Sequence, residues 1–201
     1  MKTFMALIVM FAVLAFVSGC GGGKTVTRLD TESVTDLSGR WNDTDSRLVA
    51  EEMVSDALSR PWLTRFTSQQ GAMPVVTVGT IRNRTAEHIE METFISDFER
   101  ELINAGSVRF VASKEARSEI REERQEQQEF ASRETAKRMR EETGADFILQ
   151  GALKTIIDEE GGKQVRYYQT DLELINIETM EKVWIGSKKI KKGITQGKWK
   201  S

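Results

Sequence analysis

The spacing of apolar residues changes from one segment of the chain to the next, and each spacing predicts a different element. Between residues 46 and 60, apolar side chains recur every three or four positions, as on one face of an α-helix. These are Leu48, Val49, Met53, Val54, Ala57 and Leu58. Residues 42–45 are all good N-cap residues and predict the start of this helix. Arg60-Pro61 predicts its end, because the residue before a proline is disfavoured in helical backbone.

A short strand and a second amphipathic helix are predicted next. Pro74 opens a β-branched run, residues 75–79, which is typical of a buried strand. Asn83-Arg84-Thr85 predicts an exposed turn. The helical spacing that follows is the clearest in the chain and comprises Met91, Phe94, Ile95, Phe98, Leu102 and Ala105. Gly106 is expected to close that helix in a left-handed conformation, and residues 108–111 predict a second strand.

Residues 113–143 are rich in glutamate and arginine and predict a solvated helix, with a break near residues 127–132. Three strands are then expected at about residues 145–158, 163–177 and 182–191. The first two are joined by Glu159-Glu160-Gly161-Gly162, and a Gly-Gly pair between strands is a strong hairpin signal.

These elements predict the fold class α/β. Strands joined through helices pair in parallel with right-handed crossovers, whereas the last three strands must form an antiparallel meander. We therefore expect a mixed five-stranded sheet in the order 2-1-3-4-5, with helices packed on it. The meander ends in a lysine-rich edge strand, which discourages open-ended pairing.

The first residues follow a different pattern, an unbroken apolar run from Phe4 to Val17 behind Lys2. The run is typical of a secretory signal and is too short for a stable membrane span. It ends in Val17-Ser18-Gly19-Cys20, which resembles the lipobox of bacterial lipoproteins. We expect removal of residues 1–19 and lipidation of Cys20, palmitate included. Gly21 is not the aspartate that favours inner-membrane retention, so we expect the protein on the periplasmic face of the outer membrane.

The remaining chain is expected to hold one folded domain. Residues 20–41 show no sustained periodicity and predict a lipidated flexible tether, residues 42–194 a single α/β domain, and residues 195–201 a tail. The net charge of −2 lacks the basic excess of nucleic-acid binders, so no nucleic-acid partner is expected. Cys20 is the only cysteine, which leaves no thiol for a disulfide.

Catalytic chemistry is not indicated. His88 is the only histidine, and we expect it to be a solvated residue in the first turn of a helix. Zinc sites need three or four histidine, cysteine or carboxylate ligands, and Asp43 and Asp45 are better explained as helix caps. We therefore expect no enzyme, no cofactor and no metal.

Protein binding is the better class of function. Tyr167 and Tyr168 are neighbours on a predicted strand, so they point to opposite faces, one into the core and one toward a partner. The alternative is that both rings pack under helices. Asn83 and Arg84 follow the first strand where the strand order reverses, a common place for ligand contacts. They are candidate partner contacts, unless they only cap the next helix.

Five segments of the chain resemble one family of bacterial lipoproteins, the LpoB family. They are residues 36–45, 75–79, 81–85, 145–151 and 178–184. The resemblance spans about residues 36–194 and implies a fold related to the N-terminal domain of TolB. It also implies a non-catalytic activator that docks on a penicillin-binding protein, a bifunctional peptidoglycan synthase, and so regulates cell-wall synthesis and cell shape. The competing interpretation is a structural lipoprotein that scaffolds another envelope complex.

Overall fold

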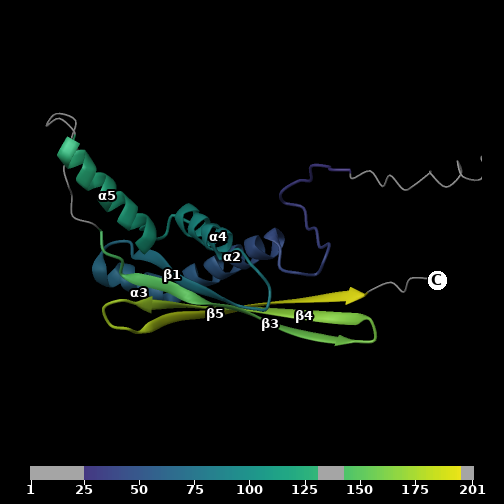
Figure 1. Ribbon diagram of the computed structural model, residues 1–201. Coiled ribbons are helices and arrows are strands. Elements are labelled where there is room, and N and C mark those ends of the chain that lie inside the picture. The colour runs from purple at the N-terminus through teal and green to yellow at the C-terminus, as the bar shows by residue number, and fades with distance from the viewer. Residues whose placement is uncertain (1–24, 131–142, 196–201) are drawn as a thin grey trace, which may run out of the picture. The chain divides into compact units, whose positions relative to one another are not determined.

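The computed structural model describes residues 25–130 and 143–195 (Figure 1). The chain divides into two compact units, one ending at Ser33 and one beginning at Val34. In the first unit, a turn is closed where the Ser33 amide donates to the Asp30 carbonyl at 3.1 Å. In the described part of the chain, no helix has the length and apolar character needed to cross a membrane. Cys20 and the predicted signal lie outside the described residues.

The second unit contains the elements of an α/β domain. In chain order they are α2 (Asp43–Leu58), α3 (Pro61–Gln70), β1 (Val75–Arg84), α4 (Met91–Asn104), β2 (Arg109–Phe110), α5 (Lys114–Phe130), β3 (Phe147–Glu160), β4 (Lys163–Asn176) and β5 (Lys182–Thr195). The sheet order is β2-β1-β3-β4-β5. β1 pairs in parallel with β2 and β3, while β3, β4 and β5 pair antiparallel. The predicted fold class and strand order are confirmed.

The N-terminus of α2 is fixed by a capping box. The Asn42 side chain accepts a hydrogen bond from the Asp45 amide, and the Asp45 carboxylate accepts one from the Asn42 amide. These two bonds satisfy backbone donors that a helix start leaves unpaired. Of the helix face predicted from the spacing, Val49, Met53, Val54 and Ala57 are buried, whereas Leu48 is 41% exposed. Ala50, which the spacing did not predict, is fully buried in its place.

Helix α3 was not predicted from the sequence. Arg60 is extended, with φ −86° and ψ 154°, so Pro61 ends α2 as expected and also occupies the first turn of a new helix. Proline is well tolerated there, because its missing N–H would have no partner. Trp62 is buried and its ring packs edge-on against Phe147, with centroids 5.0 Å apart. Phe66, four residues later, packs on the same ring at 5.2 Å. Two aromatic residues one helical turn apart give too short a pattern to reveal a helix.

Strand β1 is longer than predicted, and the turn expected at residues 83–85 is wrong for its first two residues. Val78 pairs with Leu149 and Ile81 with Gly151, so an extra residue bulges out between them. Gly79 lies in this bulge, and a Cβ there would come within 2.7 Å of Ile148. Because the bulge lets pairing continue, Asn83 and Arg84 end the strand. The chain turns only from Thr85 onward.

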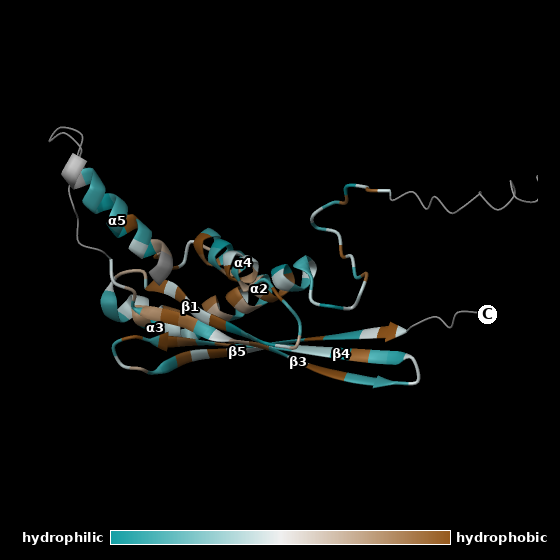
Figure 2. Ribbon diagram, in the orientation of Figure 1, coloured by the Kyte–Doolittle hydropathy of each residue, from teal (hydrophilic) through white to brown (hydrophobic). Residues whose placement is uncertain are grey.

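The other elements differ from the predictions mainly at their ends. Gly161 and Gly162 both have positive φ, 58° and 78°, as the hairpin requires, and Gly106 also has positive φ. β2 is shorter than predicted, whereas β3 and β5 run further. α5 is largely hydrophilic (Figure 2) and is described up to Phe130. The predicted break near residues 127–132 extends into residues 131–142, which lie outside the described part.

The hydrophobic core lies between the sheet and the helices α2 and α4 (Figure 1). Phe94 and Phe98 of α4 are almost fully buried and contact each other edge-to-face at 5.0 Å. The alternating residues Phe147, Leu149, Leu172, Leu174 and Trp184 form the sheet side of the core. The opposite side of the central strands is therefore left to bind solvent or a partner.

Candidate functional site

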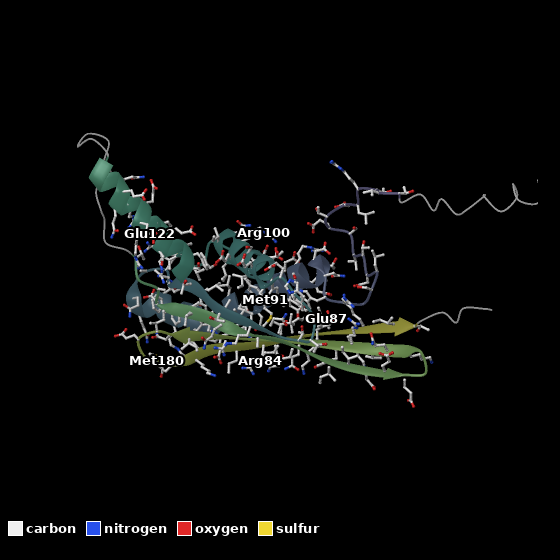
Figure 3. All side chains as sticks on the ribbon, viewed as in Figure 1. Arg84, Glu87, Met91, Arg100, Glu122 and Met180 are labelled. Carbon is white, nitrogen blue, oxygen red and sulfur yellow. The ribbon has the colours of Figure 1, made fainter. Side chains whose placement is uncertain are left out.

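Residues that alternate with the core positions form what we call the open face of the sheet. Strand register assigns them, because residues paired across strands point to the same side. Across the central strands the open face comprises Arg82, Arg84, Gln150, Ala152, Lys154, Ile156, Tyr167, Gln169, Asp171, Glu173, Lys182, Ile185, Ser187, Lys189 and Lys191. Asp158 and Glu160 continue this face toward the β3–β4 hairpin. Figure 3 shows Arg84 on the side of the sheet away from α2 and α4.

The two carboxylates in the middle of the open face, Asp171 and Glu173, are neutralised by lysines on neighbouring strands. Asp171 accepts from Lys154 at 2.9 Å, and Glu173 forms an ion pair with Lys182 at 2.5 Å. Burial alone would raise the pKa of Asp171, but its hydrogen bonds, with Lys154 foremost, lower it below the ordinary value. The hydrogen bond from Lys182 likewise lowers the pKa of Glu173. Both groups therefore stay ionised near neutral pH.

Around Arg84 the other charges of the open face are cationic and uncompensated, whereas the exposed carboxylates Asp158 and Glu160 lie further along β3, toward the β3–β4 hairpin. Arg82, Arg84, Lys189 and Lys191 make no ion pair with any other residue that the structure describes. Ile156 and Ile185 are exposed apolar residues on the same face, 66% and 68% exposed. Basic side chains set among apolar and tyrosine residues form a surface that suits an acidic protein partner.

The structure separates the four residues predicted as partner contacts. Arg84 and Tyr167 lie on the open face, and the Tyr167 hydroxyl donates only a long 3.3 Å bond to Gln169. Asn83 instead accepts from the Thr85 amide at 2.9 Å and donates to a backbone carbonyl at 2.8 Å, so it organises the turn after β1. Tyr168 is 0% exposed and has no surface to offer. The alternation predicted for the two tyrosines is confirmed.

Tyr168 belongs to a buried polar cluster on the helix side of the sheet. Glu87 accepts from the Tyr168 hydroxyl at 2.7 Å, from Arg166 at 2.5 Å and from the Trp41 amide at 3.3 Å. The Trp41 ring meets Tyr168 and Phe94 edge-on, at 5.5 and 5.7 Å. Burial, together with the hydrogen bond to Glu87, raises the pKa of Tyr168 to about 12. The cluster is therefore structural.

Lys192 is a buried cation that sequence reasoning treated only as part of the lysine-rich edge. It is 9% exposed and donates to Asp45 at 2.6 Å, to Asp36 at 2.5 Å and to the Arg40 carbonyl at 3.2 Å. Burial alone would lower the pKa of Lys192, but the two carboxylates outweigh burial and the pKa is raised. The sequence contained a sign of this burial, because alternation along the strand points residue 192 to the same side as Trp184 and Ile190.

No arrangement for catalysis is found among the described residues. His88 is exposed and lies in the loop before α4, not in the first turn as predicted, because the helix begins only at Met91. The described residues include no cluster of histidine, cysteine or carboxylate ligands that could hold a metal. Asp45 acts in the helix cap, as expected.

Comparisons with known proteins give one family model and several similar solved structures. A family model described as "Peptidoglycan-synthase activator LpoB" matches residues 45–190. Among solved structures, the LpoB C-terminal domain of Escherichia coli is 18% identical, with 73% of this chain and 98% of that chain covered and a TM-score of 0.43. The corresponding domain of Salmonella enterica is 18% identical, covers 76% and 99%, and has a TM-score of 0.38.

A third similar structure is the lipoprotein GNA1162 of Neisseria meningitidis. It is 11% identical, with 64% of this chain and 88% of that chain covered and a TM-score of 0.41. A comparison with curated proteins gives no match.

Proposed function

This chain belongs to the LpoB family of peptidoglycan-synthase activators, and from that premise we propose that it binds and activates a bifunctional penicillin-binding protein. The family's role is regulatory and non-catalytic, which confirms the expectation that the chain is not an enzyme. The activator adds no reacting group. It raises the rate by binding the active conformation of the synthase more tightly than the inactive one.

The observation that carries the docking proposal is the uncompensated basic character of the open face around Arg84. We propose that the synthase presents an acidic surface to Arg82, Arg84 and Lys189, with Tyr167 beside them as an aromatic anchor. Tyrosine and arginine are enriched at interface hot spots, and complementary charge speeds association. Asn83 and Tyr168 are no longer proposed as partner contacts, because their side chains form hydrogen bonds within the domain.

We further propose that the protein is a lipoprotein held at the periplasmic face of the outer membrane through Cys20. The support is the lipobox-like tetrapeptide behind an apolar run. Several acyl chains, at about 0.8 kcal/mol per buried CH₂, anchor a protein far more firmly than one chain does. A membrane anchor at Cys20 restricts the search for a partner to the periplasmic domains of envelope proteins.

Binding to purified synthases tests the docking proposal. The bifunctional penicillin-binding proteins of the same organism would be immobilised one at a time, and the affinity of the chain measured at two salt concentrations. Arg84→Glu is expected to weaken binding by about 2–4 kcal/mol, since it replaces an attraction by a repulsion. Tyr167→Ala should cost at least about 1 kcal/mol.

A matched control separates this surface from a general charge effect. Arg65→Glu makes the same charge change at an exposed position of α3 on the helix layer and should leave the affinity unchanged. Equal losses in Arg84→Glu and Arg65→Glu would contradict the open face as the docking site. Absence of binding to every synthase would favour the scaffold interpretation.

A further inference from the structure

The segment before α2 is attached to the domain, although its sequence predicts a flexible tether. The compact unit begins at Val34. Asn42 donates to the Asp36 carboxylate at 2.8 Å and to the Thr35 carbonyl at 3.2 Å, which folds residues 35–36 back against the helix start. We refer to residues 34–41 as the strap.

At Gly39 the backbone of the strap comes close to β5. Its φ is +66°, a conformation that L side chains rarely adopt, and a Cβ at this position would overlap the Ile194 side chain. Only glycine therefore allows the backbone to lie against this strand. The Gly39 carbonyl also lies 3.5 Å from the Tyr168 hydroxyl.

Lys192 holds the strap through both a side chain and the backbone. Its ammonium group bonds the Asp36 carboxylate and the Arg40 carbonyl of the strap, and also Asp45 of α2. The ion pair with Asp45 is buried on both sides, at 9% and 6% side-chain exposure. Removing one partner of such a pair leaves an uncompensated buried charge, which is strongly unfavourable.

Trp41 fixes the end of the strap nearest the domain. Its indole N–H donates to Ser46 at 2.8 Å and its amide donates to Glu87, while its ring packs against Phe94 and Tyr168. The strap is thus held at both ends and at its glycine. A flexible spacer would make no such fixed hydrogen bonds or close side-chain packing with the domain.

We propose that the strap is a releasable part of the tether and that Lys192 is its latch, so that the latched state limits the reach of the domain. This consequence rests on the proposed anchor at Cys20. With the strap latched, residues 21–33 can span at most about 43–47 Å at ~3.3–3.6 Å per residue. Release of residues 34–41 adds up to about 26–29 Å.

Limited trypsin digestion of the full chain in detergent micelles tests the latch. Trypsin can cut after Arg40, but the latched strap holds this bond through Lys192 and Glu87. Lys192→Met and Gly39→Ala should each accelerate formation of the fragment that begins at Trp41 by about tenfold or more, because cleavage requires local opening. Cleavage after Arg28, which precedes the strap, should keep its rate in all variants.

Two control variants match these changes. Lys191→Met removes the neighbouring lysine, which is exposed and has no ion pair with a described residue, and should not alter cleavage after Arg40. Gly71→Ala places alanine at an equally positive φ of +65°, with open space around the new Cβ, and should leave the strap protected.

Cleavage after Arg40 as fast as after Arg28 in the unaltered chain would overturn the proposal, and so would unchanged protection in Gly39→Ala. If trypsin cuts Lys192→Met at sites along the whole chain, that variant is unfolded. Gly39→Ala then provides the test of the latch, because its added methyl group lies outside the core. Fatty-acid labelling of the same preparations separates the two proposals. Absence of labelling would exclude the proposed anchor at Cys20, whereas the rate of cleavage after Arg40 tests only whether the strap is held.

Discussion

The packing of the hydrophobic core can be tested by replacing Phe98 of α4 with alanine. Phe98 is 1% exposed, contacts the ring of Phe94 and lines a small apolar cavity of about 20 Å³ beneath α2 and α4. Phe98→Ala should lower the free energy of unfolding by about 3–5 kcal/mol, the usual cost of truncating a buried phenylalanine. The existing cavity places our expectation in the upper half of that range, because the loss grows with the volume of the void left behind.

Urea unfolding of the chain from residue 21 onward, followed by circular dichroism, measures this cost. The transition midpoint should fall while the dependence of the free energy on urea stays unchanged, since the unfolded surface is nearly the same. Ile103→Ala is the control on the same helix, because Ile103 is 56% exposed and should cost no more than about 0.5 kcal/mol. A cost for Phe98→Ala below about 1 kcal/mol would refute the core described above.

Three further predictions follow from single sites. Cys20→Ala should abolish fatty-acid incorporation in cells, and labelling at the unaltered level would exclude the anchor. Because the pKa of Tyr168 is raised to about 12 in the folded protein, its stabilising effect is complete below pH 10 and is lost as the pH rises toward 12. Ultraviolet titration should therefore show a tyrosinate step near pH 12 that is missing in Tyr168→Phe, and persistence of that step would assign it to Tyr167. Gly151→Ala should destabilise strongly, because a Cβ there overlaps the backbone of β4, whereas Gly193→Ala meets open space, so equal melting temperatures would contradict the strand register.

The fold could be predicted from the sequence because local patterns and strand topology agree. The helical spacing from Met91 onward and the paired glycines at residues 161–162 each point to one structure. The bulge in β1 could not be predicted in this way. It depends on contact between Gly79 and Ile148, two residues far apart in the sequence. Helix α3 was missed because it is anchored mainly by Trp62.

The candidate site was predicted only in part. Alternation correctly separated Tyr167 from Tyr168, but the direction of Arg84 depends on the bulge that precedes it. The strap was missed because residues 34–41 have no periodicity, and their order comes from Lys192, a distant residue on β5. A lysine at an inward-facing strand position signals a buried partner, but the sequence does not reveal which one.

The central claim is that this chain activates a peptidoglycan synthase through its open face. The most direct measurement is the rate of glycan polymerisation by a purified bifunctional penicillin-binding protein of the same organism as the chain is added. We expect a saturable increase in rate, which Arg65→Glu retains and which Arg84→Glu shifts to higher concentrations of the chain. A polymerisation rate that stays constant while the two proteins are fully bound would contradict activation.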